Sequence, residues 1–77
     1  MRKARTEYGR EDARILKNIG GNIRKMRHEV GLSQEDMQDY DISLRHYQRI
    51  ECGQINPTAL VLIKIAKAFK CDVKDFL

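Results

Sequence analysis

The sequence is poor in the features that mark several large classes of protein. It contains no tryptophan, one proline and two cysteines among its 77 residues. It has no run of eighteen apolar residues, which excludes an ordinary membrane-spanning helix, and residues 1–10 lack the apolar segment of a secretory signal peptide. We therefore expect a soluble, cytoplasmic chain whose cysteines stay reduced.

Residue types that carry chemistry are equally sparse. Cys52 and Cys71 form no CxxC pair and the two histidines form no HxxxH pair, so we expect neither a disulfide scaffold nor a metal site. The sequence also lacks a nucleophile elbow, a glycine loop that could cradle a phosphate and a plausible pair of catalytic carboxylates. We predict that the chain is not an enzyme, has no catalytic residues and uses no cofactor or small-molecule ligand.

Basic residues gather in the N-terminal part of the chain. The net charge is +4, and residues 1–31 hold nine Lys/Arg against four Asp/Glu, whereas residues 32–77 hold six against seven. This asymmetry is typical of proteins with a polyanionic partner, although a solvated tail explains it equally well. We divide the chain into a basic N-terminal arm, residues 1–11, and one domain, residues 12–77.

Helical periodicity dominates that domain. Apolar residues recur every three or four positions between Ile15 and Val30, but Gly20-Gly21 interrupts them, so this segment is either one kinked helix or two short ones. Capping and stop residues predict further helices over residues 34–40, 44–51 and 59–70 and a short last one. The capping residues are Ser33 with Asp36, Ser43, Thr58, and Asp72 with Asp75. The predicted fold class is all-α, with about five short helices.

Only a few residues around Asp41-Ile42 separate the helices predicted over residues 34–40 and 44–51. So short a turn makes its two helices cross steeply, as in a helix-turn-helix, and the second helix can then protrude into the major groove of DNA. Tyr47 and Ile50 can point inward, which leaves Leu44, Arg45, Gln48 and Arg49 facing outward and His46 at the edge. Arginine can donate two hydrogen bonds to guanine, glutamine can pair with adenine, and leucine can touch a thymine methyl or a partner chain. A plain solvated face explains these residue types almost as well.

An ordered set of short motifs then resembles the phage-repressor-like helix-turn-helix family, the Cro and repressor type that includes the xenobiotic-response-element family. The set runs through residues 19–77 as IG and IR at 19–24, R-x3-GLSQED at 27–36, IS at 42–43, RIE-x-G at 49–53, NP at 56–57, IAKAF at 65–69 and V-x2-FL at the end. The resemblance implies a compact five-helix, lambda-repressor-like DNA-binding domain.

The resemblance also implies roles for individual residues. Leu44, Arg45 and Arg49 match the base-contacting positions, and His46 and Gln48 lie beside them. The phosphate-contacting positions are Ser33, Gln34 and Arg24. Arg27 and Glu51 match an internal salt bridge, and the alternative for Arg27 is a cation that faces phosphate or solvent.

The chain departs from the family pattern in one segment. From Gln34 to Glu51 it is one residue shorter than usual, and the gap falls within residues 37–42. Gln38 replaces a small residue, which predicts a distorted end to the helix at 34–40. Asp41 replaces the usual turn glycine, but aspartate tolerates the left-handed conformation. Tyr47 replaces an aliphatic residue, so its hydroxyl needs a partner if it is buried.

Residues 59–63 are five consecutive apolar residues, more than one buried helix face can use. We expect Ala59, Leu62, Ile65, Ala66 and Phe69 in the core, whereas Leu60, Val61 and Ile63 lie partly on another face. A homodimer interface explains the second set, and so does an N-terminal helix that folds back over it.

These patterns predict a sequence-specific regulator of transcription that binds double-stranded DNA as a homodimer. We expect it to act as a repressor on a pseudo-palindromic operator, without contacting a membrane. The alternative is a protein-interaction module, such as an antitoxin-like or regulatory subunit. Structured RNA is a weaker candidate partner, because the chain offers no aromatic stacking surface.

Overall fold

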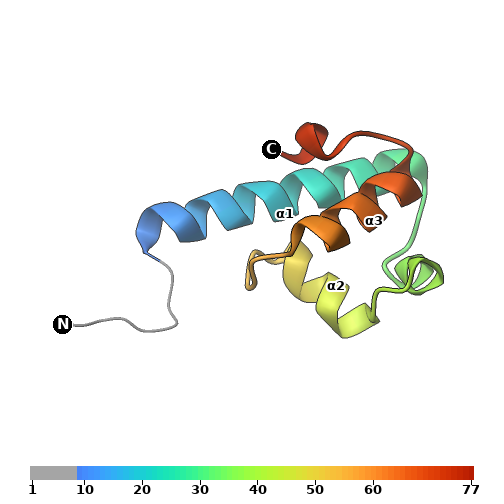
Figure 1. The fold of residues 1–77 in the computed structure, drawn as a ribbon, viewed down its shortest axis with the longest axis horizontal. Coiled ribbons are helices and arrows are strands. Elements are labelled where there is room, and N and C mark those ends of the chain that lie inside the picture. The colour runs from blue at the N-terminus through green and yellow to red at the C-terminus, as the bar shows by residue number, and fades with distance from the viewer. Residues whose placement is uncertain (1–8) are drawn as a thin grey trace.

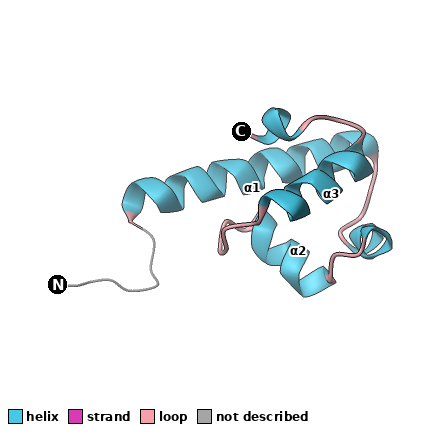
Figure 2. Ribbon diagram, in the orientation of Figure 1, coloured by secondary structure: helices cyan, strands magenta, loops and turns pink. Residues whose placement is uncertain are grey.

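The computed structural model describes residues 9–77, which form three α-helices and two 3-10 helices (Figures 1 and 2). In chain order these are α1 (Arg10–Val30), η1 (Glu35–Tyr40), α2 (Leu44–Glu51), α3 (Ala59–Phe69) and η2 (Val73–Phe76). The described residues contain no strand, and the predicted all-α class is confirmed. Residues 1–8, most of the predicted arm, lie outside the described part of the chain. α1 already begins at Arg10.

α1 is a single continuous helix that runs through Gly20-Gly21 (Figure 1). Gly20 lies where α1 crosses the C-terminal end of α2, and a Cβ atom there would come closer than 3.0 Å to the backbone oxygens of Ile50 and Glu51. A Cβ atom on Gly21 would meet nothing within 4 Å. Only the first glycine is therefore required by packing, since it lets the two backbones touch. The helix ends at Gly31, which has a left-handed φ of 78°.

The first helix of the helix-turn-helix is a 3-10 helix, whereas its capping pattern predicts an ordinary α-helix. A 3-10 helix rises about 2.0 Å per residue against about 1.5 Å for an α-helix, so six residues span the length of about eight. The predicted distortion thus extends through the whole element rather than only its end. Asp41 ends it with a left-handed φ of 63°, as expected for the turn.

The predicted caps are present. The Ser33 backbone N–H donates to Asp36 Oδ2 at 2.8 Å, and the Asp36 N–H donates back to Ser33 Oγ at 3.1 Å. Ser43 accepts from the N–H of His46, starting α2, and Thr58 accepts from the N–H of Val61, starting α3. The Asp72 N–H donates to the Asp75 carboxylate at the start of η2.

The core lies between α1, α2 and α3 and is closed by η1 and η2. Its largest fully buried side chains are Tyr47, Phe76, Ile23, Met37, Ile50 and Ile65. Phe69 and Phe76 meet edge to face with ring centroids 6.0 Å apart. The Asn22 side chain donates to the Phe76 carbonyl at 2.9 Å, which fixes η2 to α1.

One expectation for α3 is wrong: Ala59, predicted to lie in the core, is exposed. Val61 is half-buried and packs partly against the core, so it lies only partly on the outer face, as expected. Leu60 and Ile63 remain 63% and 42% exposed, so α1 does not fold back to cover them. Cys52 and Cys71 are both free thiols. No helix in the described residues is both long and apolar enough to cross a membrane.

The two adjacent glycines allow a matched test of the packing between α1 and α2. We expect Gly20→Ala to destabilise the domain by at least about 1–3 kcal/mol, because its methyl group would overlap a backbone that cannot move freely. We expect Gly21→Ala to stabilise it by about 0.5–1 kcal/mol through helix propensity alone. Urea unfolding followed by circular dichroism measures both changes, and equal effects of the two substitutions would contradict the close contact at Gly20.

Candidate functional site

α2 is held by one face and exposes the other. Tyr47 and Ile50 point into the core, as predicted, and both are essentially fully buried. The remaining candidate side chains lie on the outer side of the helix: Leu44 is half-buried, and Arg45, His46, Gln48 and Arg49 are exposed. The three ion pairs found among the described residues involve neither Arg45 nor Arg49. Both guanidinium groups therefore face solvent without a competing carboxylate.

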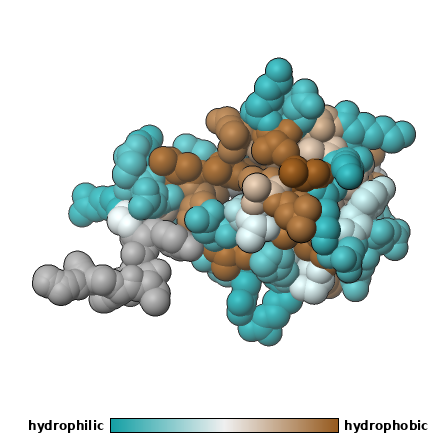
Figure 3. Space-filling model, in the orientation of Figure 1, coloured by the Kyte–Doolittle hydropathy of each residue, from teal (hydrophilic) through white to brown (hydrophobic). Residues whose placement is uncertain are grey.

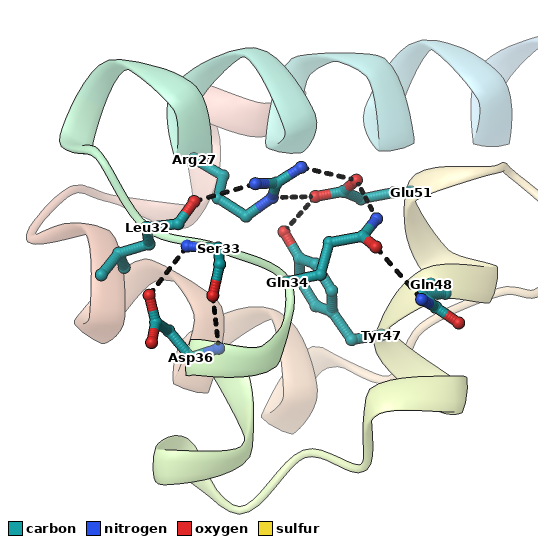
Figure 4. A network of polar contacts seen from close by, with 8 residues as sticks. All are labelled: Arg27, Leu32, Ser33, Gln34, Asp36, Tyr47, Gln48 and Glu51. Atoms are coloured by element: carbon teal, nitrogen blue, oxygen red, sulfur yellow. Dashed lines mark hydrogen bonds and ion pairs between the residues drawn. The ribbon is translucent and has the colours of Figure 1, made fainter.

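The inner face of α2 ends in a buried carboxylate, Glu51, which is saturated with hydrogen bonds (Figure 4). Its Oε2 accepts from Arg27 Nε at 2.7 Å and from the Tyr47 hydroxyl. Its Oε1 accepts from Gln34 Nε2 at 2.9 Å and from Arg27 Nη2 at 3.3 Å. The side chains of Arg27 and Glu51 are only 8% and 3% exposed, so Arg27 is not a cation that faces phosphate or solvent.

Burial and bonding compete in setting the charge of this cluster. Burial alone would raise the pKa of Glu51, but the hydrogen bonds from Arg27, Tyr47 and Gln34 outweigh it and hold that pKa below its usual value. The hydrogen bond to Glu51 raises the pKa of Arg27 despite its burial. Burial, together with the neighbouring carboxylate, raises the pKa of Tyr47 well above its ordinary value. The cluster thus holds a charged pair and a phenol that remains a donor at neutral pH.

A chain of side-chain amides connects this buried cluster to the outer face of α2 (Figure 4). Gln48 Nε2 donates to Gln34 Oε1 at 3.1 Å, and Gln34 in turn donates to Glu51. No pattern in the sequence indicates this link, because the two glutamines are 14 positions apart and belong to different elements. The bond from Tyr47 to Glu51 could have been found from sequence, since residues four apart share a helix face.

The candidate phosphate-contacting residues come from two elements, and Gln34 alone among them is hydrogen-bonded to α2. Ser33 and Gln34 stand at the start of η1, and Arg24 is exposed on α1. Arg27 also donates from Nη1 to the Leu32 carbonyl at 2.8 Å, which anchors the chain just before Ser33. The same buried arginine therefore positions α2 and the segment that leads into η1. Within the described residues, no three potential metal-ligating side chains cluster together.

This chain is similar in sequence and in structure to known proteins. Residues 23–76 match the model of the helix-turn-helix family. Over 55 residues the chain is 33% identical to the HTH-type transcriptional regulator y4dJ of Sinorhizobium fredii, a match that covers 70% of this chain and 71% of that protein. The structure is similar to the crystal structure of the restriction-modification controller protein C.AhdI from Aeromonas hydrophila. The TM-score is 0.77 at 26% identity, and the match covers 84% of this chain and 98% of the other.

The lowered pKa of Glu51 predicts a loss of stability in acid. A carboxyl group whose pKa is lower in the folded than in the unfolded chain stabilises the fold above the unfolded value, near 4.5, and loses that contribution as the pH falls through the folded value. At neutral pH we expect Glu51→Gln to cost about 3–5 kcal/mol, because it strands the Arg27 charge. The difference in unfolding free energy between the unaltered protein and the variant should become smaller below pH 4.5, since protonated glutamate resembles glutamine.

Urea unfolding of both proteins from about pH 7 down to about pH 2.5 measures this difference in unfolding free energy. A difference that stays constant over the whole range would contradict the lowered pKa of Glu51. If the variant does not fold, NMR titration of the Glu51 carboxyl carbon in the unaltered protein decides the same question, because its midpoint should lie below 4.5.

Proposed function

The chain belongs to the helix-turn-helix family, and on this premise we propose that it is a sequence-specific DNA-binding regulator of transcription that acts as a repressor. The observation that carries the proposal is the outer face of α2, where Arg45 and Arg49 stand exposed and unpaired on a helix fixed from behind by Glu51. A rigid, protruding helix with free guanidinium groups suits the major groove, where arginine can bond guanine O6 and N7.

Gln48 is the proposed adenine-reading residue, with Gln34 as its support. An amide nitrogen carries two hydrogens, and Gln48 uses one of them in its bond to Gln34. The other hydrogen and the Gln48 carbonyl oxygen can then meet adenine N7 and N6 together. Leu44 and His46 complete the proposed base-contacting set at the edges of the helix.

The proposed phosphate contacts flank that helix. Gln34 keeps a second amide hydrogen after donating to Glu51, and the hydroxyl hydrogen of Ser33 is free because its oxygen acts as an acceptor in the cap. Arg24 supplies a positive charge from α1. Such contacts position a protein on the duplex and give salt-dependent affinity without reading sequence. Residues 12–77 would form the binding domain and residues 1–11 the arm.

We further propose that the active form is a homodimer joined through the exposed apolar residues of α3. Leu60 and Ile63 are exposed, and Val61 lies half-buried between them. Apolar side chains gather over α1 and α3 on the face shown in Figure 3. A twofold dimer would read two half-sites of a pseudo-palindromic operator about 34 Å apart. This role requires no catalysis, and we place it in the cytoplasm, together with the DNA that it would bind.

Arg45 provides the test of sequence readout. Selection from a random duplex pool first identifies the preferred site, which should have twofold symmetry. On that site we expect Arg45→Ala to lose about 1–3 kcal/mol of binding free energy, with little loss on random duplex, because a base contact is removed. Uniform weakening on all sequences would make Arg45 a phosphate ligand instead. Absence of any salt-dependent binding by the unaltered protein would favour the protein-interaction module.

Two exposed apolar positions test the dimer, one on the proposed interface of α3 and one away from it on α1. We expect Leu60→Glu to shift the protein to monomer, because two like charges would be buried opposite each other at the interface. Val30→Glu is the control, since Val30 is also exposed but lies at the far end of α1. Sedimentation equilibrium measures both, and a monomeric unaltered protein, or a Leu60→Glu protein as dimeric as the control, would overturn the proposal.

A further inference from the structure

One face of α1 carries a line of cations that the proposed base contacts do not use. Arg10, Arg14, Lys17 and Arg24 follow one another at spacings of four, three and seven, which are close to one, one and two turns of an α-helix, so they share one stripe. All four are exposed. The first three precede residues 23–76, the segment matched by the family model.

One residue of this line contacts the segment that follows α2, and the neighbouring face of α1 packs on α2 itself. Gly20 packs on the backbone oxygens at the end of α2, Arg27 bonds Glu51, and the backbone of Lys17 lies against Gly53, where an added Cβ atom would be 2.8 Å from Lys17 Cα. Lys17 is therefore adjacent to the residues that follow α2. The preceding turns of α1 project beyond the rest of the domain, and hydrophilic side chains cover that end (Figures 1 and 3).

The charges on this line are available to a partner. Among the described residues, Arg10, Lys17 and Arg24 take part in no ion pair. Arg14 pairs with Glu11 at 2.7 Å, but both side chains are about two-thirds exposed, and surface pairs of this kind exchange easily. Lys25 behaves differently: it borders a hollow shared with Glu29 and Asp75, on the side of α1 that faces η2.

We infer that the N-terminal half of α1 is a second phosphate-binding surface, in which Arg10, Arg14 and Lys17 contact the DNA backbone beside the groove that α2 enters. The inference rests on the proposed function. From Arg10 to Arg24 the helix extends about 21 Å at 1.5 Å per residue, and a DNA strand carries a phosphate about every 3.4 Å along the axis. A line of cations of this length can therefore follow several consecutive phosphates, adding affinity but no sequence preference.

A pair of charge-matched double variants tests this surface. R10Q/K17Q removes two cations from the proposed surface, and K25Q/K74Q removes two from the side of the molecule that carries η2. All four positions are exposed, so both proteins should fold, and circular dichroism verifies this. Binding of the full chain to the selected operator and to random duplex is measured between about 50 and about 300 mM salt.

We expect R10Q/K17Q to flatten the slope of log affinity against log salt concentration by about 0.9 for each phosphate that the variant no longer neutralises, on both duplexes equally. K25Q/K74Q should leave the slope unchanged. If the two variants have the same slope, the inference of a second phosphate-binding surface is wrong, while the proposed function stands. If R10Q/K17Q weakens the operator alone, these residues read sequence and the inference is also wrong. Absence of DNA binding by the unaltered protein would instead reject the proposed function itself.

Discussion

The carboxylate of Glu51 is the point on which the arrangement of this domain depends. It ends α2, lies almost fully buried, and receives hydrogen bonds from α1 through Arg27, from the segment before η1 through Gln34, and from its own helix through Tyr47. A buried charge is tolerated only when its partners are in place, and the loss of one partner costs far more than the pair contributes. Elements distant in sequence are therefore held in one relative orientation. That orientation leaves the opposite face of α2 free.

The close approach of α1 and α2 works together with this cluster. Gly20 lets the backbone of α1 rest on the last carbonyls of α2, and two turns further along α1 Arg27 bonds Glu51 at the end of the same helix. The short turn between η1 and α2 also has to be compatible with the orientation of the elements that Glu51 holds together. The 3-10 geometry makes η1 longer per residue than an α-helix, and Asp41 accepts the left-handed backbone that the turn requires.

Much of the fold follows from local chemistry that is visible in the sequence. Ser33, Ser43 and Thr58 begin their elements because their hydroxyls accept from the backbone N–H groups of a first turn, and Gly31 ends α1 because it adopts the left-handed conformation freely. The inward direction of Tyr47 and Ile50 follows from their spacing. The two glycines of α1 have identical helix propensity, so propensity does not distinguish them, and only the contact with α2 shows that Gly20 is required by packing. The 3-10 form of η1 is likewise not predictable from local patterns, because its capping residues are those of an ordinary α-helix.

The sequence alone determined which side chains α2 could present, because helical spacing fixes the face on which each residue lies. The tertiary structure decided which of them are free. Arg45 and Arg49 face solvent without partners, whereas Gln48 is oriented by Gln34, a residue on another element. It also decided that Lys17 of α1 lies against Gly53, just after α2, because Gly20 and Arg27 hold α1 against the end of that helix. Helical periodicity tells on which face of its own helix a residue lies, but only the packing of one helix against another decides which faces lie next to each other.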